Sequence, residues 1–311
     1  MKILVADVMH ESLYPMLEEA GFQADSMPFI KRDELREVLP NYDGLILRSK
    51  TRVDRDLLGD NPGIRIIGRA GAGIDNLDES YLAEKGIHIV NAPEGNRNAV
   101  GEHCLGMLLS LFNHLRRADA EVRQETWDRE GNRGHELKGK TVGIIGYGNM
   151  GMSFARKLSG MSCKVLAFDK YKKHYSDKYA IASGMDRIFA EADVLSLHVP
   201  LTEETRFMID VEFFAKFAKP IYFLNTARGE IVRLSVLANS LKRGLLIGAG
   251  LDVIENEKLQ TLTPEQREAF KFLAKRNDVL FSPHVGGWSF ESYVRINEVL
   301  VSKLAAWRAA L

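Results

Sequence analysis

The feature that most constrains the fold of this chain is a glycine-rich turn near its middle. The apolar run Thr141–Ile145 leads directly into Gly-Tyr-Gly-Asn-Met-Gly at 146–151, which opens a helical pattern over 149–159. A second apolar run, Lys164–Phe168, ends in Asp169. This order predicts the βαβ unit that binds a dinucleotide, because such a unit has a strand, a glycine turn, a helix and an acidic residue at the end of the next strand.

The three glycines of this turn have distinct roles in such a unit. Gly146 permits the tight turn, Gly148 lets the backbone approach a pyrophosphate, and Gly151 lets the helix pack against the sheet. The helix N-terminus then offers free amides and the positive end of its dipole to the phosphates. Asp169 is expected to accept hydrogen bonds from the adenosine ribose and to repel the extra phosphate of NADP. The cofactor is therefore expected to be NAD, although three lysines between 170 and 173 weaken that exclusion.

The rest of the chain alternates short apolar strands with helical patterns, which predicts parallel sheets covered by helices. With 311 residues the chain is long enough for two domains. Before the glycine turn, strands are expected at 2–6, 42–47, 64–68 and 87–90, and helices at 11–20, 33–39, 78–84 and 99–123. After it, strands are expected at 164–168, 194–197, 221–224, 247–251 and 279–281, and helices at 185–190, 211–217, 234–243, 264–275 and 289–311.

Composition argues against several classes of function. Lys plus Arg and Asp plus Glu are 42 each, so no net charge draws the chain to nucleic acid or to an anionic membrane. The longest apolar stretch, 105–112, falls short of the roughly 20 residues of a membrane span, and the N-terminus lacks the design of a signal peptide. The two cysteines, Cys104 and Cys163, are expected to be buried thiols in a reducing cytoplasm, and no Cys or His cluster predicts a metal site.

Three further motifs follow predicted strands and are therefore expected at the sheet edge that faces a cofactor. They are Leu-Asn-Thr-Ala-Arg-Gly at 224–229, Gly-Leu-Asp-Val-Ile-Glu-Asn-Glu at 250–257 and Ser-Pro-His-Val-Gly-Gly at 282–287. The glycine turn, these motifs and the segments 69–76, 91–96 and 198–202 together resemble the D-isomer-specific 2-hydroxyacid dehydrogenases along essentially the whole chain.

The resemblance implies an oxidoreductase whose active centre is formed by Arg228, Glu257 and His284. Arg228, permanently charged and forked, would bind the substrate carboxylate and polarise the carbonyl. His284 would accept the hydroxyl proton during oxidation and return it during reduction, and Glu257 would favour the imidazolium. Family members usually carry proline after this glutamate, whereas Lys258 follows here, and Glu255 is a nearby alternative.

The resemblance also implies further contacts with the cofactor and the substrate. Asn149 and Met150 would flank the pyrophosphate, and Asp252 would hold the carboxamide side of the nicotinamide. Backbone amides at Ala72 and Gly73 would bind the substrate carboxylate. The remaining implied cofactor contacts are Val199, Pro200, Thr205, Thr226, Ala227, Gly286 and Gly287.

The implied architecture is α/β: a Rossmann cofactor domain over 97–283 and a flavodoxin-like substrate domain over 1–96 and 284–311, both with mainly parallel sheets. The active site would lie in the cleft between the domains, where hinge closure excludes water. Family members usually dimerise through the cofactor domain, and the apolar helix 100–112 is expected to supply part of a homodimer surface. Because the chain stops after its terminal helix, a regulatory domain is not expected.

The substrate is expected to be a small anionic 2-hydroxy or 2-keto acid. Arg48 and Arg69 resemble arginines that phosphoglycerate dehydrogenases place near the substrate, and Lys50 and Arg52 stand nearby, which favours 3-phosphoglycerate. This basic turn is alternatively a solvated edge, and glyoxylate, hydroxypyruvate, lactate and 4-phosphoerythronate stay open as substrates. Trp288, where the family commonly has a smaller polar residue, would narrow the pocket or pack on a neighbouring subunit. A non-catalytic NAD-sensing protein on the same scaffold is the competing interpretation.

Overall fold

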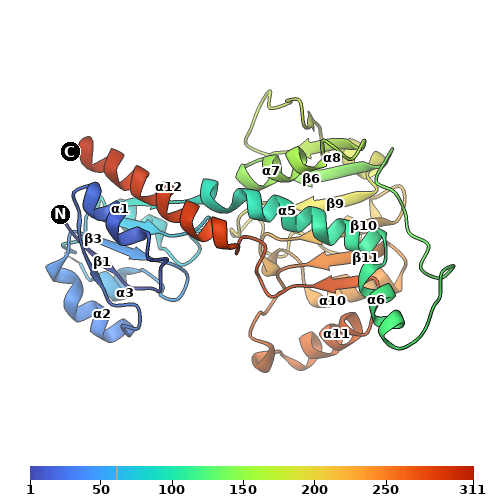
Figure 1. The fold of residues 1–311 in the computed structure, drawn as a ribbon, viewed down its shortest axis with the longest axis horizontal. Helices are drawn as coiled ribbons and strands as arrows, with labels where there is room; N and C mark the ends of the chain where they lie inside the picture. The colour runs from blue at the N-terminus through green and yellow to red at the C-terminus, as the bar shows by residue number, and fades with distance from the viewer. Residues whose placement is uncertain (61) are drawn as a thin grey trace. The chain divides into compact units, whose positions relative to one another are not determined.

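The computed structural model describes residues 1–60 and 62–311, which fold into two compact units (Figure 1). Unit 1 comprises Met1–Arg97 and Trp288–Leu311, and unit 2 comprises Asn98–Gly287. Each unit contains one sheet of parallel strands with helices packed on both of its faces. The α/β fold class predicted from the sequence is therefore confirmed.

Unit 1 contains a five-stranded sheet of order β2-β1-β3-β4-β5, and each neighbouring pair is parallel. Its strands are β1 (Lys2–Val5), β2 (Gln23–Ser26), β3 (Gly44–Leu47), β4 (Ile66–Arg69) and β5 (His88–Asn91). The chain winds in opposite directions from the boundary between β1 and β3, which is the strand order of flavodoxin-like folds. The loops that follow β1 and β3 therefore leave the sheet at its switch point.

The two faces of this sheet are buried under different helices. Along β1, Ile3 and Val5 point into the core beneath α1 and α12, while Leu4 points into the core beneath α2, α3 and α4. The helices are α1 (Leu13–Glu19), α2 (Arg32–Val38), η1 (Leu39–Asn41), α3 (Arg55–Leu58), α4 (Glu79–Glu84) and α12 (Phe290–Ala309). Ser289 starts α12 as part of a capping box, since its hydroxyl accepts a hydrogen bond from the Ser292 amide at 3.0 Å.

Unit 2 contains a seven-stranded parallel sheet of order β12-β11-β10-β9-β6-β7-β8. Its strands are β6 (Thr141–Ile145), β7 (Lys164–Phe168), β8 (Ile181–Ala182), β9 (Val194–Leu197), β10 (Ile221–Asn225), β11 (Leu246–Leu251) and β12 (Val279–Phe281). This is the doubly wound order of a Rossmann fold with one more strand at the edge, and its switch point lies between β6 and β9.

Helices also bury both faces of the sheet in unit 2. Leu108 and Phe154, on α5 and α7, pack with Ile144 on one face, whereas Phe214 and Leu241, on α9 and α10, pack on the other. The helices are α5 (Pro93–Phe112, which begins in unit 1), α6 (Leu115–Arg123), α7 (Asn149–Leu158), α8 (Met185–Glu191), α9 (Val211–Ala215), η2 (Gly229–Ile231), α10 (Leu234–Lys242), η3 (Leu259–Thr261) and α11 (Pro264–Ala274).

One predicted helix was wrong in its length, because the pattern over 99–123 is two helices. α5 ends at Phe112, and His114 adopts a left-handed conformation with φ 52° before α6 begins at Leu115. The two halves differ physically as well, since the apolar residues of α5 fill the core of unit 2 whereas α6 contributes no buried residue. The chain also forms β2, α3 and β8, which at four, four and two residues are too short to give a periodic signal.

The apolar surface of α5 is already used inside the subunit. Its residues Val100, Cys104, Met107, Leu108, Leu111 and Phe112 are all buried in the core of unit 2. The expectation that this helix presents an apolar homodimer surface is therefore wrong for these side chains. Both thiols are free, Cys104 fully buried and Cys163 partly so. Within residues 1–60 and 62–311, no helix combines the length and apolarity needed to cross a bilayer.

Candidate active site

The predicted site residues of unit 2 follow strands that end in register. Ile145 aligns with Phe168 of β7 and with Leu197 of β9, and Asn225 of β10 aligns with Leu197 and with Leu251. Leu251 in turn aligns with Phe281 of β12. The loops that carry the glycine turn, Asp169, Thr226, Asp252 and His284 therefore all leave one edge of the same sheet, which is the edge where α/β folds bind ligands.

The glycine turn has the geometry of a pyrophosphate cradle. Gly146 has φ 91°, and a Cβ there would lie 2.5 Å from the carbonyl oxygen of His198. A Cβ on Gly151 would lie 2.1 Å from the carbonyl oxygen of Gly146, so only glycine allows α7 to approach the strand this closely. At Gly148, the N-cap of α7, a Cβ would meet no atom within 4 Å, which leaves open space in front of the helix N-terminus. These residues therefore fit the diphosphate of a dinucleotide.

Asp169 braces this turn as well as ending β7. Its carboxylate accepts hydrogen bonds from the amides of Tyr147 at 2.9 Å, Tyr171 at 3.1 Å and Lys172 at 3.2 Å. The Lys172 ammonium donates to the Tyr147 carbonyl at 2.6 Å, and Lys170 pairs with Glu204. Two of the lysines that weakened the prediction of NAD over NADP are therefore engaged by the protein itself.

The loop after β9 is held by its own hydroxyl groups. Thr205 donates to the Pro200 carbonyl at 2.7 Å and accepts from the Thr202 amide at 2.8 Å, which shapes the segment next to Val199. His198 is partly buried at the start of this loop, with Nε2 2.8 Å from the Ser196 hydroxyl, and desolvation lowers the pKa of His198 to about 3. This histidine is therefore neutral at neutral pH.

Arg228 leaves β10 through a loop that the buried side chain of Asn225 organises. Asn225 donates from Nδ2 to the Arg228 carbonyl at 2.9 Å and accepts from the Ala227 amide at 3.1 Å. Arg228 itself donates from Nη1 to the Ala227 carbonyl at 2.7 Å. A Cβ on Gly229 would lie 1.8 Å from the Ile254 carbonyl oxygen, so this loop packs directly on the segment that leads to Glu257. Asn225 lies inside the motif at 224–229, but no feature of the sequence predicts that its side chain organises this loop.

Thr226, in the same loop, contacts a buried thiol. Its Oγ1 lies 3.2 Å from Sγ of Cys104, and burial raises the pKa of the Cys104 thiol to about 12. Cys104 is therefore a neutral thiol at physiological pH, which agrees with the expected buried, unreactive group.

His284 and Glu257 form a direct pair. Nδ1 of His284 lies 2.8 Å from Oε1 of Glu257, and both side chains are about half exposed, at 45% and 49%. Glu255, the alternative partner, is only 9% exposed and accepts from the Leu234 amide at 2.8 Å. His284 has φ 55°, a left-handed conformation that costs a residue with a side chain about 1–2 kcal/mol. The geometry therefore selects Glu257 as the partner of a histidine that its loop holds in a strained conformation.

Asp252 is buried beneath the loop that carries His284. The carboxylate is 2% exposed, and it accepts from the Ser282 hydroxyl at 2.6 Å, the Val285 amide at 2.9 Å and the Gly286 amide at 2.8 Å. Burial acts to raise the pKa of Asp252, but hydrogen bonds from His103, Ser282 and these amides outweigh it, so the pKa is lowered. The loop then passes through Gly287 to Trp288, where unit 1 resumes. Asp252 is therefore ionised, and its carboxylate is hydrogen-bonded to groups of the protein itself.

The predicted substrate residues all lie in unit 1. Arg48 follows β3, and its guanidinium lies 4.0 Å from the centre of the Trp288 ring and 5.4 Å from that of Tyr293. Burial lowers the pKa of Arg48, an effect that Tyr293 and Asp7 only partly offset. Arg69 ends β4 and donates to the Ala70 carbonyl at 3.3 Å.

The two residues expected to supply backbone amides follow β4 directly. Ala72 and Gly73 are partly buried, and the Ala72 carbonyl accepts from Asn91 Nδ2 at 2.6 Å. Gly71, just before them, has φ 143°. The structure therefore places this segment, together with Arg48 and Arg69, at the carboxyl edge of the unit 1 sheet.

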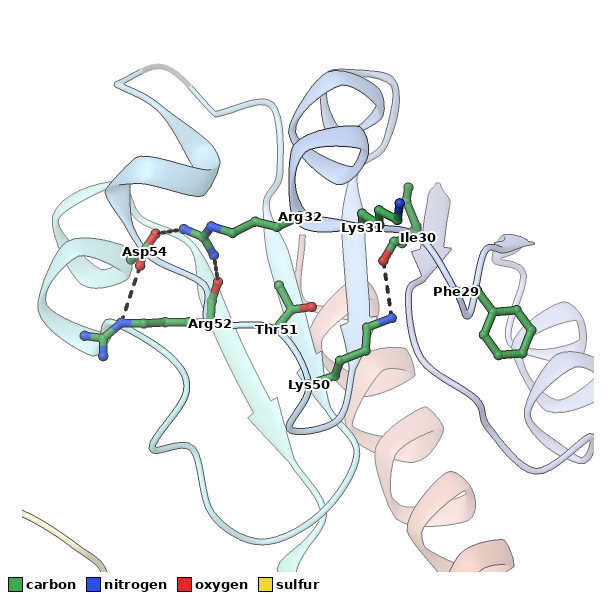
Figure 2. A pocket seen from close by; sticks show the side chains of 8 residues that line it. All are labelled: Phe29, Ile30, Lys31, Arg32, Lys50, Thr51, Arg52 and Asp54. Carbon is green, nitrogen blue, oxygen red and sulfur yellow. Dashed lines mark hydrogen bonds and ion pairs between the residues drawn. The ribbon is translucent and has the colours of Figure 1, made fainter. Parts of the chain in front are cut away.

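A hollow of about 650 Å³ lies among the loops after β2 and β3 in unit 1 (Figure 2). Arg32 extends to Asp54 at 2.5 Å, and Lys50 extends to the carbonyl groups of Pro28 and Ile30 at 2.9 and 3.3 Å. Arg52 lies 3.4 Å from Asp54. These cations are therefore engaged by the protein, and none of the predicted catalytic residues lines this hollow. In the part of the chain that the structure describes, no group of three His, Cys, Asp or Glu residues could hold a metal ion.

Comparison with known proteins places this site in a family. Residues 105–286 match the model of the D-isomer specific 2-hydroxyacid dehydrogenase NAD binding domain. Hydroxypyruvate reductase of Thermotoga maritima is 35% identical over 275 residues, 88% of each protein. D-3-phosphoglycerate dehydrogenase of Archaeoglobus fulgidus is 31% identical over 306 residues. This match covers 98% of the present chain and 56% of the A. fulgidus protein. A solved structure of Aquifex aeolicus D-lactate dehydrogenase, described as complexed with NAD and lactic acid, has a TM-score of 0.83 and 26% identity, covering 100% of this chain and 96% of that one.

The fold and the edge of the unit 2 sheet define an oxidoreductase that uses a dinucleotide. The family match covers more than half of the chain, and the T. maritima relative matches most of it. The chain belongs to the D-isomer-specific 2-hydroxyacid dehydrogenases, and the domain that matches their family model binds NAD.

Proposed function

We propose that this protein transfers a hydride between NAD and the C2 carbon of a small D-2-hydroxy acid or 2-keto acid. The observation that carries the proposal is the 2.8 Å contact between Nδ1 of His284 and Oε1 of Glu257. This pair leaves the same sheet edge as the glycine turn, because the strands that lead to them end in register. NAD, when bound, supplies the hydride acceptor for oxidation and the hydride donor for reduction.

The three proposed catalytic residues divide the remaining chemistry among themselves. Since Nδ1 of His284 faces Glu257, Nε2 is the nitrogen that takes the hydroxyl proton during oxidation and returns it during reduction. Glu257 stabilises the imidazolium that this transfer creates. Arg228 binds the substrate carboxylate through its forked guanidinium, and orients C2 for hydride transfer.

We assign cofactor binding to unit 2 and substrate selection to unit 1. The proposed cofactor contacts are Gly146, Gly148, Asn149, Met150, Gly151, Asp169, Val199, Pro200, Thr205, Thr226, Ala227, Gly286 and Gly287. Asp252 is proposed to act on the nicotinamide side only indirectly, because its carboxylate is buried and accepts from three groups of the His284 loop. Arg48, Arg69, Ala72 and Gly73 are the proposed substrate contacts.

Two substrate classes are candidates. The contacts in unit 1 favour an unphosphorylated acid such as hydroxypyruvate or glyoxylate, because Trp288 covers the Arg48 guanidinium and Lys50 is engaged by backbone carbonyls. The relation to a hydroxypyruvate reductase over 88% of both proteins supports the same class. 3-Phosphoglycerate, favoured by the sequence motifs, is the second candidate, and the relation to a phosphoglycerate dehydrogenase supports it.

A homodimer is also proposed, with a different surface from the one expected from the sequence. Leu115 and Val122 of α6 are 55% and 51% exposed, and Trp127 in the following loop is 83% exposed. Exposed apolar groups of this size on a helix without buried residues support a contact with a second subunit. Light scattering at micromolar concentration tests it, since a monomeric mass contradicts the proposal. A cytoplasmic location remains a proposal that cell fractionation would test.

A substrate panel tests the proposed activity. Purified protein with NADH and hydroxypyruvate, glyoxylate, pyruvate, phosphohydroxypyruvate or the keto acid of 4-phosphoerythronate is expected to consume NADH with at least one of them. The reverse reaction is expected to accept the D-hydroxy acid and not its L-enantiomer. Binding of NADH without turnover across the panel would instead identify a non-catalytic NAD-sensing protein.

A further inference from the structure

One buried side chain accepts three hydrogen bonds from the loop that carries His284. The Asp252 carboxylate accepts from the Ser282 hydroxyl and from the amides of Val285 and Gly286, at 2.6 to 2.9 Å. The His284 amide donates to the Asp252 carbonyl at 2.8 Å. A residue in a left-handed conformation persists only where its surroundings fix it on both sides, and these bonds do so for His284 with its φ of 55°.

A second histidine reaches this network from α5. Nε2 of His103 lies 2.8 Å from the Ser282 hydroxyl and 3.4 Å from Oδ1 of Asp252. The single proton of the Ser282 hydroxyl is donated to the Asp252 carboxylate, which can only accept because it is ionised. Nε2 of His103 must therefore carry a proton and donate it to the Ser282 oxygen, which fixes the orientation of the hydroxyl.

The loop backbone at Gly286 packs closely on this network. A Cβ on Gly286 would lie 2.9 Å from Oδ2 of Asp252 and 3.3 Å from Cδ2 of His103. The loop backbone therefore rests directly on both side chains, and a shift of either one changes the path of the backbone. The loop in turn sets where the His284 imidazole lies relative to Glu257.

From these contacts we infer that His103 is a positioning residue, which acts through Ser282 and Asp252 to hold the His284 loop in its strained, productive conformation. The inference gives a role in catalysis to a histidine that contacts neither Glu257 nor His284 in the described structure. Its effect on turnover rests on the proposed function, whereas its effect on the loop does not.

Two substitutions at His103 separate the hydrogen bond from simple space filling. His103→Gln keeps an amide donor near the position of Nε2, and is expected to keep kcat for 2-keto acid reduction within about 3-fold of wild type. His103→Leu removes the donor, and is expected to lower kcat about 10- to 100-fold with little change in the NADH dissociation constant, since displacements near 1 Å cost this much. Glu102→Gln, on the exposed side of the same helix, is the matched control and should leave kcat unchanged.

Ser282→Ala tests whether the effect travels by the inferred route. Ser282→Ala alone should lower kcat to a similar extent as His103→Leu, and the double variant should be no worse than either single one, because both break the same chain of hydrogen bonds. A double variant whose loss of kcat equals the product of the two single losses would overturn the inference. A His103→Gln variant as impaired as His103→Leu would overturn it as well.

Amide exchange in the free protein tests the loop without any reliance on activity. In His103→Leu, the Val285 and Gly286 amides are expected to exchange at least about 10-fold faster than in wild type, while the Ile144 amide in the central strand, which reports on global folding, keeps its rate. Unchanged exchange at Val285 and Gly286 would overturn the inference. Faster exchange in a protein that turns over no substrate would leave the positioning role standing and would contradict the proposed function alone.

Discussion

Nδ1 of His284 lies 2.8 Å from Oε1 of Glu257, although these residues lie in the loops after two different strands, β12 and β11. The aligned ends of these strands, Leu251 and Phe281, start both loops from the same point of the sheet edge. A carboxylate at this distance stabilises an imidazolium and leaves the other ring nitrogen for a substrate.

Glu257→Gln should lower kcat for 2-keto acid reduction by about 10-fold or more, because the imidazolium loses its charged partner. NADH affinity should stay within about 2-fold, since the pair lies outside the glycine turn. Glu255→Gln is the matched control: its carboxylate accepts from the buried Leu234 amide, so this change should lower the melting temperature and leave kcat per folded molecule nearly intact. Steady-state kinetics and thermal unfolding of both variants check the assignment, and the reverse pattern would exchange the two roles.

Asp169→Asn should weaken NAD about 10- to 100-fold, because charged hydrogen bonds of this kind are worth roughly 1.5–3 kcal/mol. NADP should be affected less, since the carboxylate no longer repels its extra phosphate. Part of the loss for both cofactors should come from the Tyr147 amide, which Asp169 braces at 2.9 Å. Titration calorimetry with each cofactor measures the ratio of the dissociation constants for NAD and NADP. Asp186→Asn at the exposed start of α8 is the control. A ratio unchanged from wild type would show that Asp169 does not select the cofactor.

Trp288→Ser should raise kcat/KM for phosphohydroxypyruvate relative to hydroxypyruvate, by up to about 10-fold. The ring covers the Arg48 guanidinium at 4.0 Å, and a cation–π contact worth about 0.5–2 kcal/mol competes with a phosphate for that group. Phe290→Ser, which removes an aromatic ring that is 95% exposed two residues later, controls for loss of apolar surface. An equal change for both substrates would remove Trp288 from the account of specificity.

His198 should make the protein lose stability in acid. Its pKa is about 3 in the folded state, below the usual 6.5, so the unfolded chain takes up a proton that the folded chain excludes. Above pH 6.5 His198 is neutral in both states and does not lower the free energy of unfolding. Below pH 6.5 this free energy falls by about 1.4 kcal/mol for each pH unit, until the folded pKa is reached. Urea unfolding between pH 7 and 4 measures this slope. His198→Gln should flatten it, and an equally steep slope in that variant would assign the effect to other groups.

The sequence predicted those parts of the molecule whose signal is local. The glycine turn and the strand before it needed no long-range information, because Gly146 and Gly151 stand where only glycine fits. Arg228, Glu257 and His284 were expected from the family resemblance that their motifs carry, and the structure brings Glu257 and His284 into contact. The choice between Glu255 and Glu257 required the structure, because it depends on which carboxylate is buried against α10.

What the sequence could not predict depends on contacts between distant segments. His103 on α5 and Ser282 after β12 are 179 residues apart, and no spacing rule joins them. The stacking of Arg48 on Trp288 is of the same kind, since it depends on how α12 packs on the unit 1 sheet. The break at His114 was missed because both halves of the pattern have helical spacing, and only burial distinguishes α5 from α6.

The most direct test of the central claim compares wild type with His284→Ala in the reduction of the best 2-keto acid from the panel, with NADH binding measured in parallel. The variant is expected to bind NADH as wild type does and to lose turnover by about 10²- to 10⁴-fold, the usual contribution of a general acid. A His284→Ala protein that still turned over at the wild-type rate would contradict the central claim.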